Sequence, residues 1–470
     1  MFKNDTINEY EKMSMKEVKC MTVDVRESEI IDQIYHNNKK IVSVELALNK
    51  AIDPIALFQL TEEDKGNRFY FRENGGQSAF FGYRVAQTFS NHIENKQSIF
   101  EEWLKYKSNI NLIHFESEYH HLKICGGFQF SSHQKDDRWR RFGLNHFVLP
   151  EVLISFEEDQ TYITYTVSKE DFSMEDLKAE IKRVLNAEKE PLKPISDVKR
   201  IEDIFKDEWK DIVSDVVNAM NEDEKVVLAR RRIVRFEEDI PVYTVINQAL
   251  ENEKNSYLFV LESGEDTFLS QTPEQLMRVK DGVLKTKAIA GTIKRSFDEE
   301  EDLKQIEDFL NDPKNLQEHQ FVVDSILEDT ESYIESIDYN KEPKLLKNDH
   351  LYHLLTEFKG PLSTKGYISL IDRLHPTPAL GGFPKEKALE FIEKHEFGTR
   401  GLYGAPVGFI DVYNDCEFIV AIRSMLIKDV GALLFAGCGI VYDSIPEKEI
   451  EETALKFMPM MKALGVEQYV

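Results

Sequence analysis

The sequence is poor in cysteine, in long apolar runs and in positive charge. Its 470 residues include four widely separated cysteines, and these form no metal-ligand spacing. The uncharged stretch 430–442 is shorter than the ~20 apolar residues that a membrane helix needs. The first residues, MFKNDTINEYEKM, contain no apolar segment typical of a secretory signal. We therefore expect a reduced, cytoplasmic protein with no membrane partner.

Acidic residues dominate the charge. The chain has 59 Lys and Arg against 85 Asp and Glu, a formal net charge of −26. Because such a surface repels phosphates, we expect no nucleic-acid partner. The hydrophobic content of 41% and the aromatic content of 11% are high enough for large buried cores. The composition thus indicates a folded acidic protein.

The pattern of apolar residues predicts a mixed α+β fold. Strands are predicted in several short runs, and helices over 204–220 and 315–326; the strand runs are 122–125, 152–156, 162–167, 226–229, 257–261, 418–422 and 432–436. A charged segment with two prolines, 187–196, divides the chain into residues 1–196 and 197–470. We expect these parts to form one structural unit, and the lack of regular strand–helix alternation argues against a doubly wound sheet.

A helix is predicted to begin at Ser444, where Ser444-Ile-Pro-Glu447 has the form of a capping box. Glu449, Glu452 and Lys456 then fall on one narrow stripe of this helix. Two carboxylates one turn apart suit a hard cation such as Mg²⁺, and the lysine suits an anionic ligand. The alternative is a solvent-facing stripe with an internal Glu–Lys pair.

Other charged residues next to apolar segments are candidates for catalysis or binding. Lys225 precedes an apolar strand, where it could act as a general base or simply extend to water. Glu274 lies in Thr272-Pro-Glu-Gln-Leu276, which has the pattern of a helix start. Arg423 follows an apolar strand, where it could bind a carboxylate or form a structural salt bridge. Glu318 lies in a predicted helix, where an isolated glutamate is usually a surface residue.

Taken together and in order, these segments resemble the chorismate-utilising enzymes, the family of isochorismate, salicylate, anthranilate and aminodeoxychorismate synthases. The resemblance runs from about residue 205 to the C-terminus. It rests on Lys225-Val-Val-Leu-Ala-Arg230, Thr272-Pro-Glu274, Ala288-Ile-Ala-Gly-Thr292, Glu318-His319, His353-Leu354, His375-Pro-Thr-Pro-Ala-Leu-Gly-Gly382, Arg400-Gly-Leu-Tyr-Gly-Ala-Pro-Val-Gly408, Val420-Ala-Ile-Arg-Ser424, Ala436-Gly-Cys-Gly-Ile-Val441 and Glu449-Ile-Glu-Glu-Thr-Ala-Leu-Lys456.

The resemblance implies a fold and a reaction. The fold would be α+β, with two packed antiparallel sheets, outer helices and a deep Mg²⁺-dependent site. Lys225 stands where amine-transferring members typically have glutamine, so water would be the nucleophile. Ala290 stands where aminodeoxychorismate synthases typically have a nucleophilic lysine. The sequence therefore resembles isochorismate synthases most, and we expect no glutaminase partner.

The resemblance also implies roles for individual residues. Glu318 and Glu452, with Glu449 assisting, would hold Mg²⁺. Lys225 would be the general base and Glu274 the general acid. The residues expected to bind the substrate chorismate are Ala290, Gly291, Thr292, His353, Tyr403, Arg423, Gly437, Gly439 and Lys456.

Three alternatives remain open from the sequence. A salicylate synthase would also eliminate pyruvate, an anthranilate-forming enzyme would need ammonia, and a non-catalytic paralogue would only bind chorismate. Isochorismate feeds menaquinone and catechol siderophores, and we favour menaquinone because the N-terminal region is long and divergent.

Overall fold

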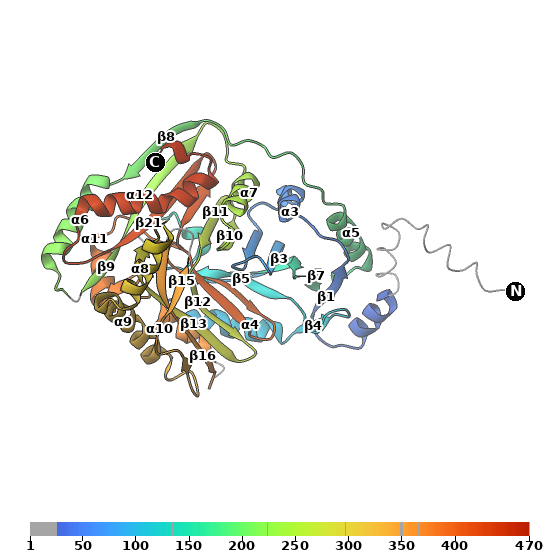
Figure 1. Cartoon of the computed structure of the whole chain (residues 1–470). Helices are drawn as coiled ribbons and strands as arrows, with labels where there is room; N and C mark the ends of the chain where they lie inside the picture. Colours follow the sequence, from blue (N-terminus) through green and yellow to red (C-terminus); the bar gives the residue numbers. More distant parts are fainter. Residues whose placement is uncertain are drawn as a thin grey trace.

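The protein is described by a computed structural model (Figure 1). It describes residues 26–469 apart from 134, 159, 223, 297, 348–350 and 364–365, and the side chains of Thr292, Lys314, Glu318 and Leu351 are also outside the description. Residues 26–35 are helical. In the described part, 21 strands join in one hydrogen-bonded network that folds into two layers.

The first layer is a long antiparallel sheet with one parallel pair, β1–β4, at its edge. Neighbouring strands follow the order β4–β1–β7–β6–β3–β2–β10–β11–β20–β21–β9–β8. The strands of this layer are β1 (Ile41–Leu48), β2 (Arg68–Arg72), β3 (Ala79–Asn91), β4 (Ile110–Ile113), β6 (Asn145–Phe156), β7 (Thr161–Ser168), β8 (Val198–Ile204), β9 (Lys225–Phe236), β10 (Tyr257–Ser263), β11 (Asp266–Thr272), β20 (Ser424–Lys428) and β21 (Gly431–Ile440).

The second layer starts from the same strand β6. The first half of β6 pairs with β5 and its second half with β7, while β3 lies along its other edge. From β5 the order continues β18–β19–β12–β13–β16, and β14 and β15 pair with β16. These strands are β5 (Lys123–Phe128), β12 (Gln275–Lys280), β13 (Val283–Lys294), β14 (Asp338–Tyr339), β15 (Lys344–Lys347), β16 (Leu351–Pro361), β18 (Pro406–Asp411) and β19 (Cys416–Val420).

An aromatic core fills the space between the layers. Phe71 and Phe80 of the first layer stack at 5.3 Å between ring centroids, and Phe409 of the second layer packs edge-on against both. Large aromatic rings bury much apolar area, so this contact holds the layers together. The expected pair of packed antiparallel sheets is confirmed, with β6 shared by the two.

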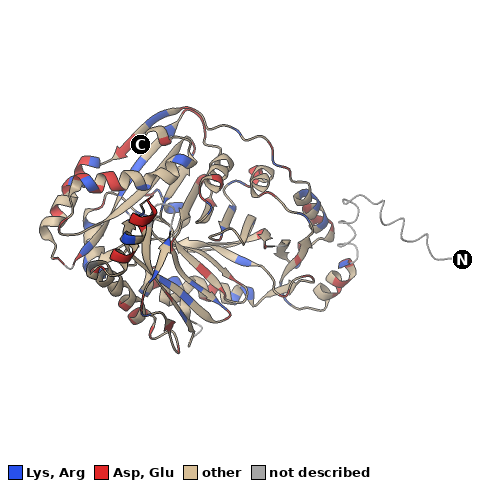
Figure 2. Ribbon diagram, viewed as in Figure 1, with Lys and Arg blue, Asp and Glu red and all other residues tan. Residues whose placement is uncertain are grey.

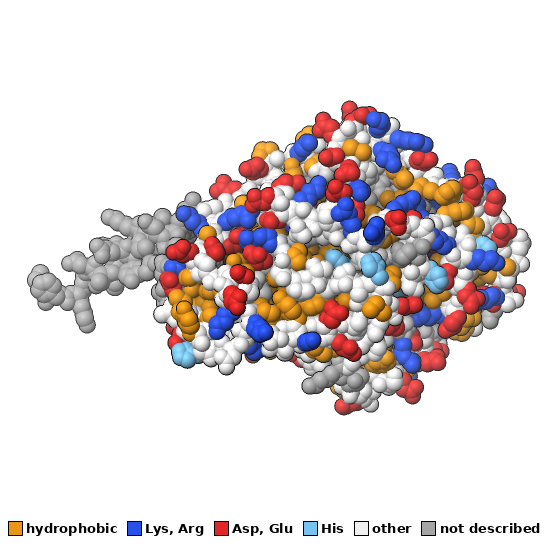
Figure 3. Space-filling model, turned by 180° about the vertical axis from the view of Figure 1, so that it is seen from behind, with side chains coloured by type: hydrophobic (Ala, Val, Ile, Leu, Met, Phe, Trp, Pro, Cys, Tyr) orange, Lys and Arg blue, Asp and Glu red, His pale blue; other side chains and the backbone are white. Residues whose placement is uncertain are grey.

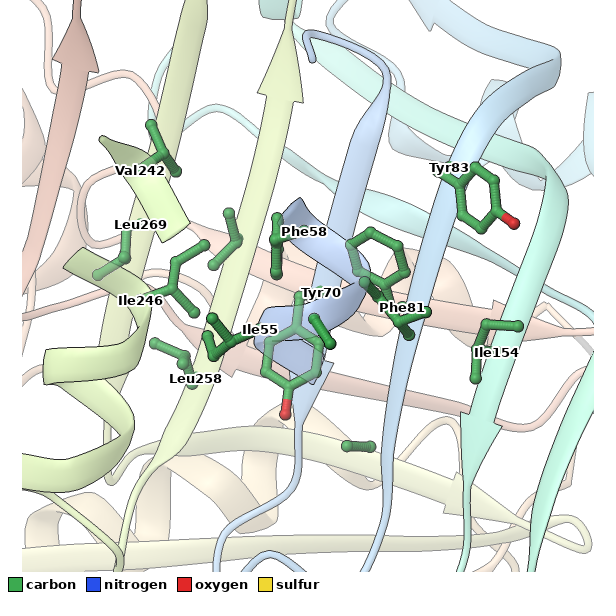
Figure 4. Packing of buried hydrophobic residues seen from close by; sticks show 14 of the residues in the cluster. Ile55, Phe58, Tyr70, Phe81, Tyr83, Ile154, Val242, Ile246, Leu258 and Leu269 are labelled. Atoms are coloured by element: carbon green, nitrogen blue, oxygen red, sulfur yellow. The ribbon is translucent and has the colours of Figure 1, made fainter. Parts of the chain in front are cut away.

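Helices cover the outer faces. On the first layer, Ile55 and Phe58 of α3 and Ile246 of α7 pack over Tyr70 and Leu258 (Figure 4). Truncation of a buried ring such as Phe58 to alanine would cost about 3–5 kcal/mol. The helices are α3 (Pro54–Leu60), α4 (Lys96–Lys107), α5 (Met174–Leu185), α6 (Lys206–Ala219), α7 (Val242–Asn252), α8 (Glu299–Leu310), α9 (Pro313–Thr330), α10 (Leu370–Leu374), α11 (Lys385–His395) and α12 (Pro446–Ala463).

The predicted helices and strands are found, with two exceptions at helix starts. Thr272-Pro-Glu274 begins no helix, because it joins β11 directly to β12. The capping box at Ser444 is also wrong: the cap position is Ile445, and the Ser444 Oγ accepts a hydrogen bond from the Val441 N–H (3.1 Å). Both sequences satisfy local rules for a helix start, but strand pairing uses the first segment and a local turn uses Ser444.

Strand pairs also connect the two parts on either side of residue 196. β2 pairs with β10, and β5 pairs with β18. The division into residues 1–196 and 197–470 stays a prediction, and these pairings are what one structural unit requires.

Charged side chains are spread over the outside. The acidic run at the start of α8 forms a red band in Figure 2, where Asp298 caps the helix through the Glu301 N–H. On the face in Figure 3, acidic and basic groups alternate with apolar ones. In the described ranges, we find no helix with the length and hydropathy of a bilayer span.

Candidate active site

Lys225 is the first residue of β9, which lies antiparallel to β21. Val227 is opposite Gly439 and Ala229 is opposite Gly437. A Cβ atom added to Gly439 would lie 2.5 Å from the Lys225 Cε and 3.3 Å from its Nζ. The half-buried lysine therefore runs across β21 at a place that only glycine leaves open.

Gly437 makes a similar space for Tyr403. A Cβ atom at Gly437 would lie 2.6 Å from the Tyr403 hydroxyl, and the tyrosine ring stacks on Phe435 at 5.1 Å. The Gly437 carbonyl accepts a hydrogen bond from Lys456 Nζ (3.0 Å). Burial raises the pKa of Tyr403, so its hydroxyl stays protonated and can donate a hydrogen bond. We call Lys225, Tyr403, Gly437, Gly439 and Lys456 the lysine group.

Helix α12 carries Lys456 together with two of the predicted metal ligands. Glu449 is half-buried, and the Glu452 side chain is 51% exposed. Lys456 Nζ also donates to Glu452 (2.6 Å), so the internal Glu–Lys pair is present as well. The helix is fixed to β9 by Arg230, which donates to Thr453 Oγ1 (2.6 Å) and to the Ile450 carbonyl (2.9 Å).

Glu274 lies at the junction of β11 and β12. Its N–H donates to Thr272 Oγ1 (3.1 Å), and its carbonyl accepts from the Val420 N–H (3.0 Å), so its backbone is held on both sides. Burial raises the pKa of the Glu274 carboxyl to about 7, although Arg423 acts in the opposite direction. A large fraction of this side chain is therefore protonated at neutral pH and can act as an acid.

Arg423 lies in the turn between β19 and β20, not at the end of a strand. Its φ of 47° is left-handed, which costs a non-glycine residue about 1–3 kcal/mol. The Arg423 carbonyl accepts from the Gln271 N–H (3.0 Å), which fixes the turn to β11. Burial lowers the pKa of Arg423, while Glu253 and Glu274 raise it. Its guanidinium remains charged and faces Glu274.

A bulge in β13 brings Gly291 close to His353. The register with β16 shifts between Ala290 and Thr292, and Gly291 has a φ of 72°. Burial lowers the pKa of His353, a hydrogen bond with the Gly291 backbone raises it, and Arg423 lowers it. The imidazole is thus neutral near pH 7. The Thr292 side chain lies outside the described residues. We call Glu274, Gly291, His353 and Arg423 the acid group.

The two groups meet at the hairpin of β20 and β21. Ser424, which follows Arg423, is opposite Phe435, and the Phe435 ring stacks on Tyr403. The Gly404 N–H donates to the Ala421 carbonyl (2.9 Å), which ties the Tyr403 loop to the strand before Arg423. These contacts connect the two groups through the β20–β21 hairpin, and the roles of the individual residues stay a prediction.

The predicted metal ligands come from two helices. Glu449 and Glu452 lie on α12 and Glu318 lies on α9, but the Glu318 side chain is outside the described residues. The described side chains contain no cluster of three metal-binding groups. Carboxylate oxygens are the donors that Mg²⁺ prefers, so the donor set fits the ion in kind. The three ligands stay a prediction.

Glu396 and Arg400 form a buried pair beside the lysine group, and no role was predicted for either residue from the sequence. Arg400 binds Glu396 through two nitrogens and also donates to the Val227 carbonyl of β9 (2.7 Å). Arg400 belongs to a motif that carried the resemblance, and an arginine within such an apolar run was a usable signal. No sequence signal pointed to Glu396, because strand β9, whose backbone it binds, is distant from it in the sequence.

Comparison with known proteins assigns the family. The family of chorismate binding enzymes matches residues 28–465. The isochorismate synthase MenF of Bacillus subtilis is 34% identical over 448 residues, covering 89% of this chain and 92% of that protein. The salicylate biosynthesis isochorismate synthase of Pseudomonas aeruginosa is 38% identical over 261 residues, 55% of each chain.

A solved structure shares the fold. It is that of MenF, the menaquinone-specific isochorismate synthase from Escherichia coli, with a TM-score of 0.77 at 22% identity, covering 94% of this chain and 99% of that one. The chain belongs to the family of chorismate-binding enzymes. Within that family, its overall architecture is that of the E. coli structure.

Proposed function

We propose that this protein is a Mg²⁺-dependent isochorismate synthase. The observation that carries the proposal is Lys225, held across Gly439 of β21. The hairpin partner of β21 is β20, which directly follows Arg423, and Arg423 is the charge that acts on Glu274. A lysine here, in place of the glutamine typical of amine-transferring members, supports water as the nucleophile. Similarity to an isochorismate synthase along nearly the whole chain supports the same conclusion.

The reaction needs a base and an acid. Lys225 takes a proton from water as the new O–C2 bond forms, and the ring double bonds shift. Glu274, whose pKa is raised to about 7, gives its proton to the 4-hydroxyl as the C4–O bond breaks. One water enters and one leaves, so the product is an isomer of the substrate.

The remaining residues bind and orient chorismate. Arg423 and Lys456 supply positive charge for its two carboxylates, and the Tyr403 hydroxyl donates a hydrogen bond. Gly437 and Gly439 leave the space that holds Tyr403 and Lys225 beside the substrate. Gly291, Ala290, Thr292 and His353 complete the site. Neutral His353 adds no charge beside Glu274, so it does not favour loss of the acid's proton.

Mg²⁺ would be held by Glu318, Glu449 and Glu452. When bound, it would neutralise the ring carboxylate and withdraw electron density from the ring. The Lys456–Glu452 contact keeps the Glu452 carboxylate on the same side of α12 as the lysine group.

The test is incubation of the full chain with chorismate and Mg²⁺ in H₂¹⁸O, followed by chromatography and mass spectrometry. Isochorismate with one ¹⁸O atom is the expected product. Salicylate with pyruvate would favour the salicylate synthase alternative, and absence of Mg²⁺-dependent consumption would favour a non-catalytic paralogue. Anthranilate formed with ammonia would favour the third alternative.

We infer further that the product is used for menaquinone in the cytoplasm, without a glutaminase. Similarity to the isochorismate synthase MenF of Bacillus subtilis covers 89% of the chain, whereas similarity to the salicylate biosynthesis isochorismate synthase covers 55%. Expression in a strain that lacks its menaquinone isochorismate synthase should restore menaquinone. Restoration of siderophore synthesis alone would contradict the inference.

A further inference from the structure

The edge of β9 that faces away from β21 has a gap in its strand pairing. β17 (Gly382–Phe383) pairs with Lys225 and Val226, and β8 pairs with β9 from Arg231 onward. Along this edge the backbone from Val227 to Arg230 has no strand partner among the described residues. Buried backbone groups need hydrogen bonds, so the gap must be filled in some other way.

Glu396 and Arg400 fill this gap. The Ala229 N–H donates to Glu396 Oε1 (2.7 Å), and Arg400 Nη2 donates to the Val227 carbonyl (2.7 Å). The Gly381 carbonyl accepts from the Val227 N–H (2.9 Å), and Arg400 Nη1 donates to the Leu380 carbonyl (3.1 Å). An ion pair thus takes the place of a strand two to four residues after Lys225.

Glu396 and Arg400 are both buried, and their opposite charges compensate each other. Glu396 is 6% and Arg400 is 5% exposed, and the guanidinium binds the carboxylate in a two-pronged contact. Burial acts to lower the pKa of Arg400, but Glu396 more than offsets it and raises this pKa. Lys135 Nζ donates to the Glu396 carbonyl (2.6 Å), and Arg231 also faces the carboxylate.

The same arginine also supports Tyr403. The Arg400 guanidinium lies 4.3 Å from the Phe130 ring centre and 5.9 Å from that of Tyr403. Its carbonyl accepts from the Tyr403 N–H (3.1 Å). Arg400 therefore contacts the backbone of β9 two residues after Lys225 and also the backbone of Tyr403.

We propose that Glu396 and Arg400 are positioning residues that fix the start of β9, and thereby Lys225, in the geometry needed for proton transfer. This inference rests on the proposed function, because it assigns Lys225 the role of the base. A displacement of about 1 Å at a reacting group is enough to slow an enzyme by about 100-fold. Loss of the pair would therefore affect turnover more than substrate binding.

A second buried pair in the same chain provides a matched control. Arg68 binds Glu262 through Nε and Nη2 (2.8 Å each), and Glu262 also accepts from the Gly66 N–H (2.8 Å). Arg68 Nη1 donates to the carbonyls of Phe58 and Thr61, as Arg400 does to two carbonyls. This pair joins β2 to β10, and the hydrogen bonds described for its charged groups go to Phe58, Thr61, Glu62 and Gly66, which lie outside the lysine and acid groups.

The experiment compares Glu396→Gln with Glu262→Gln, each alone and with Lys225→Ala. Each loses a charge from a buried pair, so the melting temperatures should fall by similar amounts. We expect Glu396→Gln to lower kcat at least tenfold with a smaller change in KM, and Glu262→Gln to leave kcat within twofold below its melting temperature. In the Lys225→Ala background, Glu396→Gln should cost less than about threefold, because residues that act as a unit are not additive.

The opposite results are distinguishable. Equal effects of the two glutamine variants on kcat, or a full tenfold loss in the Lys225→Ala background, would overturn the positioning role. Arg400→Lys keeps the positive charge but loses the two-pronged contact with Glu396. We expect this more conservative substitution to lower kcat as well. Failure of the wild-type chain to form isochorismate would instead contradict the proposed function.

Discussion

The lysine group and the acid group reach the same region by different structural means. In the lysine group, Lys225 and the glycines at 437 and 439 lie on two continuous strands, while Tyr403 lies in the turn before β18 and Lys456 lies on α12. The two glycines give the space that the Tyr403 and Lys225 side chains occupy. The acid group lies at interruptions of strands: a junction, a bulge at Gly291 and a left-handed turn at Arg423. In the lysine group, the space left by the glycines determines where the side chains lie. In the acid group, burial determines whether Glu274 and His353 are protonated.

The largest effects should come from the proposed base and acid, one in each group. Lys225→Ala and Glu274→Gln should each lower kcat by roughly two to four powers of ten, because general acid–base catalysis is lost. Steady-state kinetics with chorismate would measure this. Near-normal turnover in either variant would reject the role of that residue.

A methyl group added at Gly437 tests whether the open space beside this glycine is needed for activity. Gly437→Ala should lower kcat/KM by about 10- to 100-fold, because the new Cβ would lie 2.6 Å from the Tyr403 hydroxyl and displace it. Gly431→Ala is the control on the same strand, since its Cβ would meet nothing closer than 3.5 Å. Equal kinetics of the two variants would show that clearance at Gly437 is not needed.

Removal of a metal ligand should leave both groups in place and weaken ion binding. Glu452→Gln should raise the Mg²⁺ concentration for half-maximal activity at least about tenfold, because a charged donor is lost. Glu451→Gln, an exposed neighbour on α12, is the control. A titration of activity with Mg²⁺ gives the answer, and an unchanged midpoint for Glu452→Gln would contradict its assignment as a ligand.

The acid group predicts how activity depends on pH. Because the pKa of Glu274 is raised to about 7, its proton is present below that pH and is lost as the pH rises through it. We expect kcat/KM to fall about tenfold between pH 8 and pH 9. A pH profile without this decline would contradict the assignment of Glu274 as the acid.

Most of the fold and of the candidate site could be predicted from the sequence. Apolar periodicity located the strands and the long helices, and the ordered motifs located Lys225, Glu274 and Arg423. The helix start predicted at Thr272 was wrong, because strand pairing uses that segment. The helix predicted at Ser444 is present, but its cap is Ile445, because Ser444 accepts a hydrogen bond within a local turn. Glu396 could not be found, because its role depends on a gap between two strands that only the folded chain shows.

Strand β6 has a consequence for the molecule as a whole. One of its halves is bonded to β5 and the other to β7, while β3 lies along its opposite edge. Because β6 belongs to both layers, the layers cannot separate unless its hydrogen bonds to β5 or to β7 break. Unfolding of one layer should therefore unfold the other. We therefore expect the N-terminal and the catalytic parts of the chain to unfold in one transition, although a chain of 470 residues is larger than the domains that usually do so.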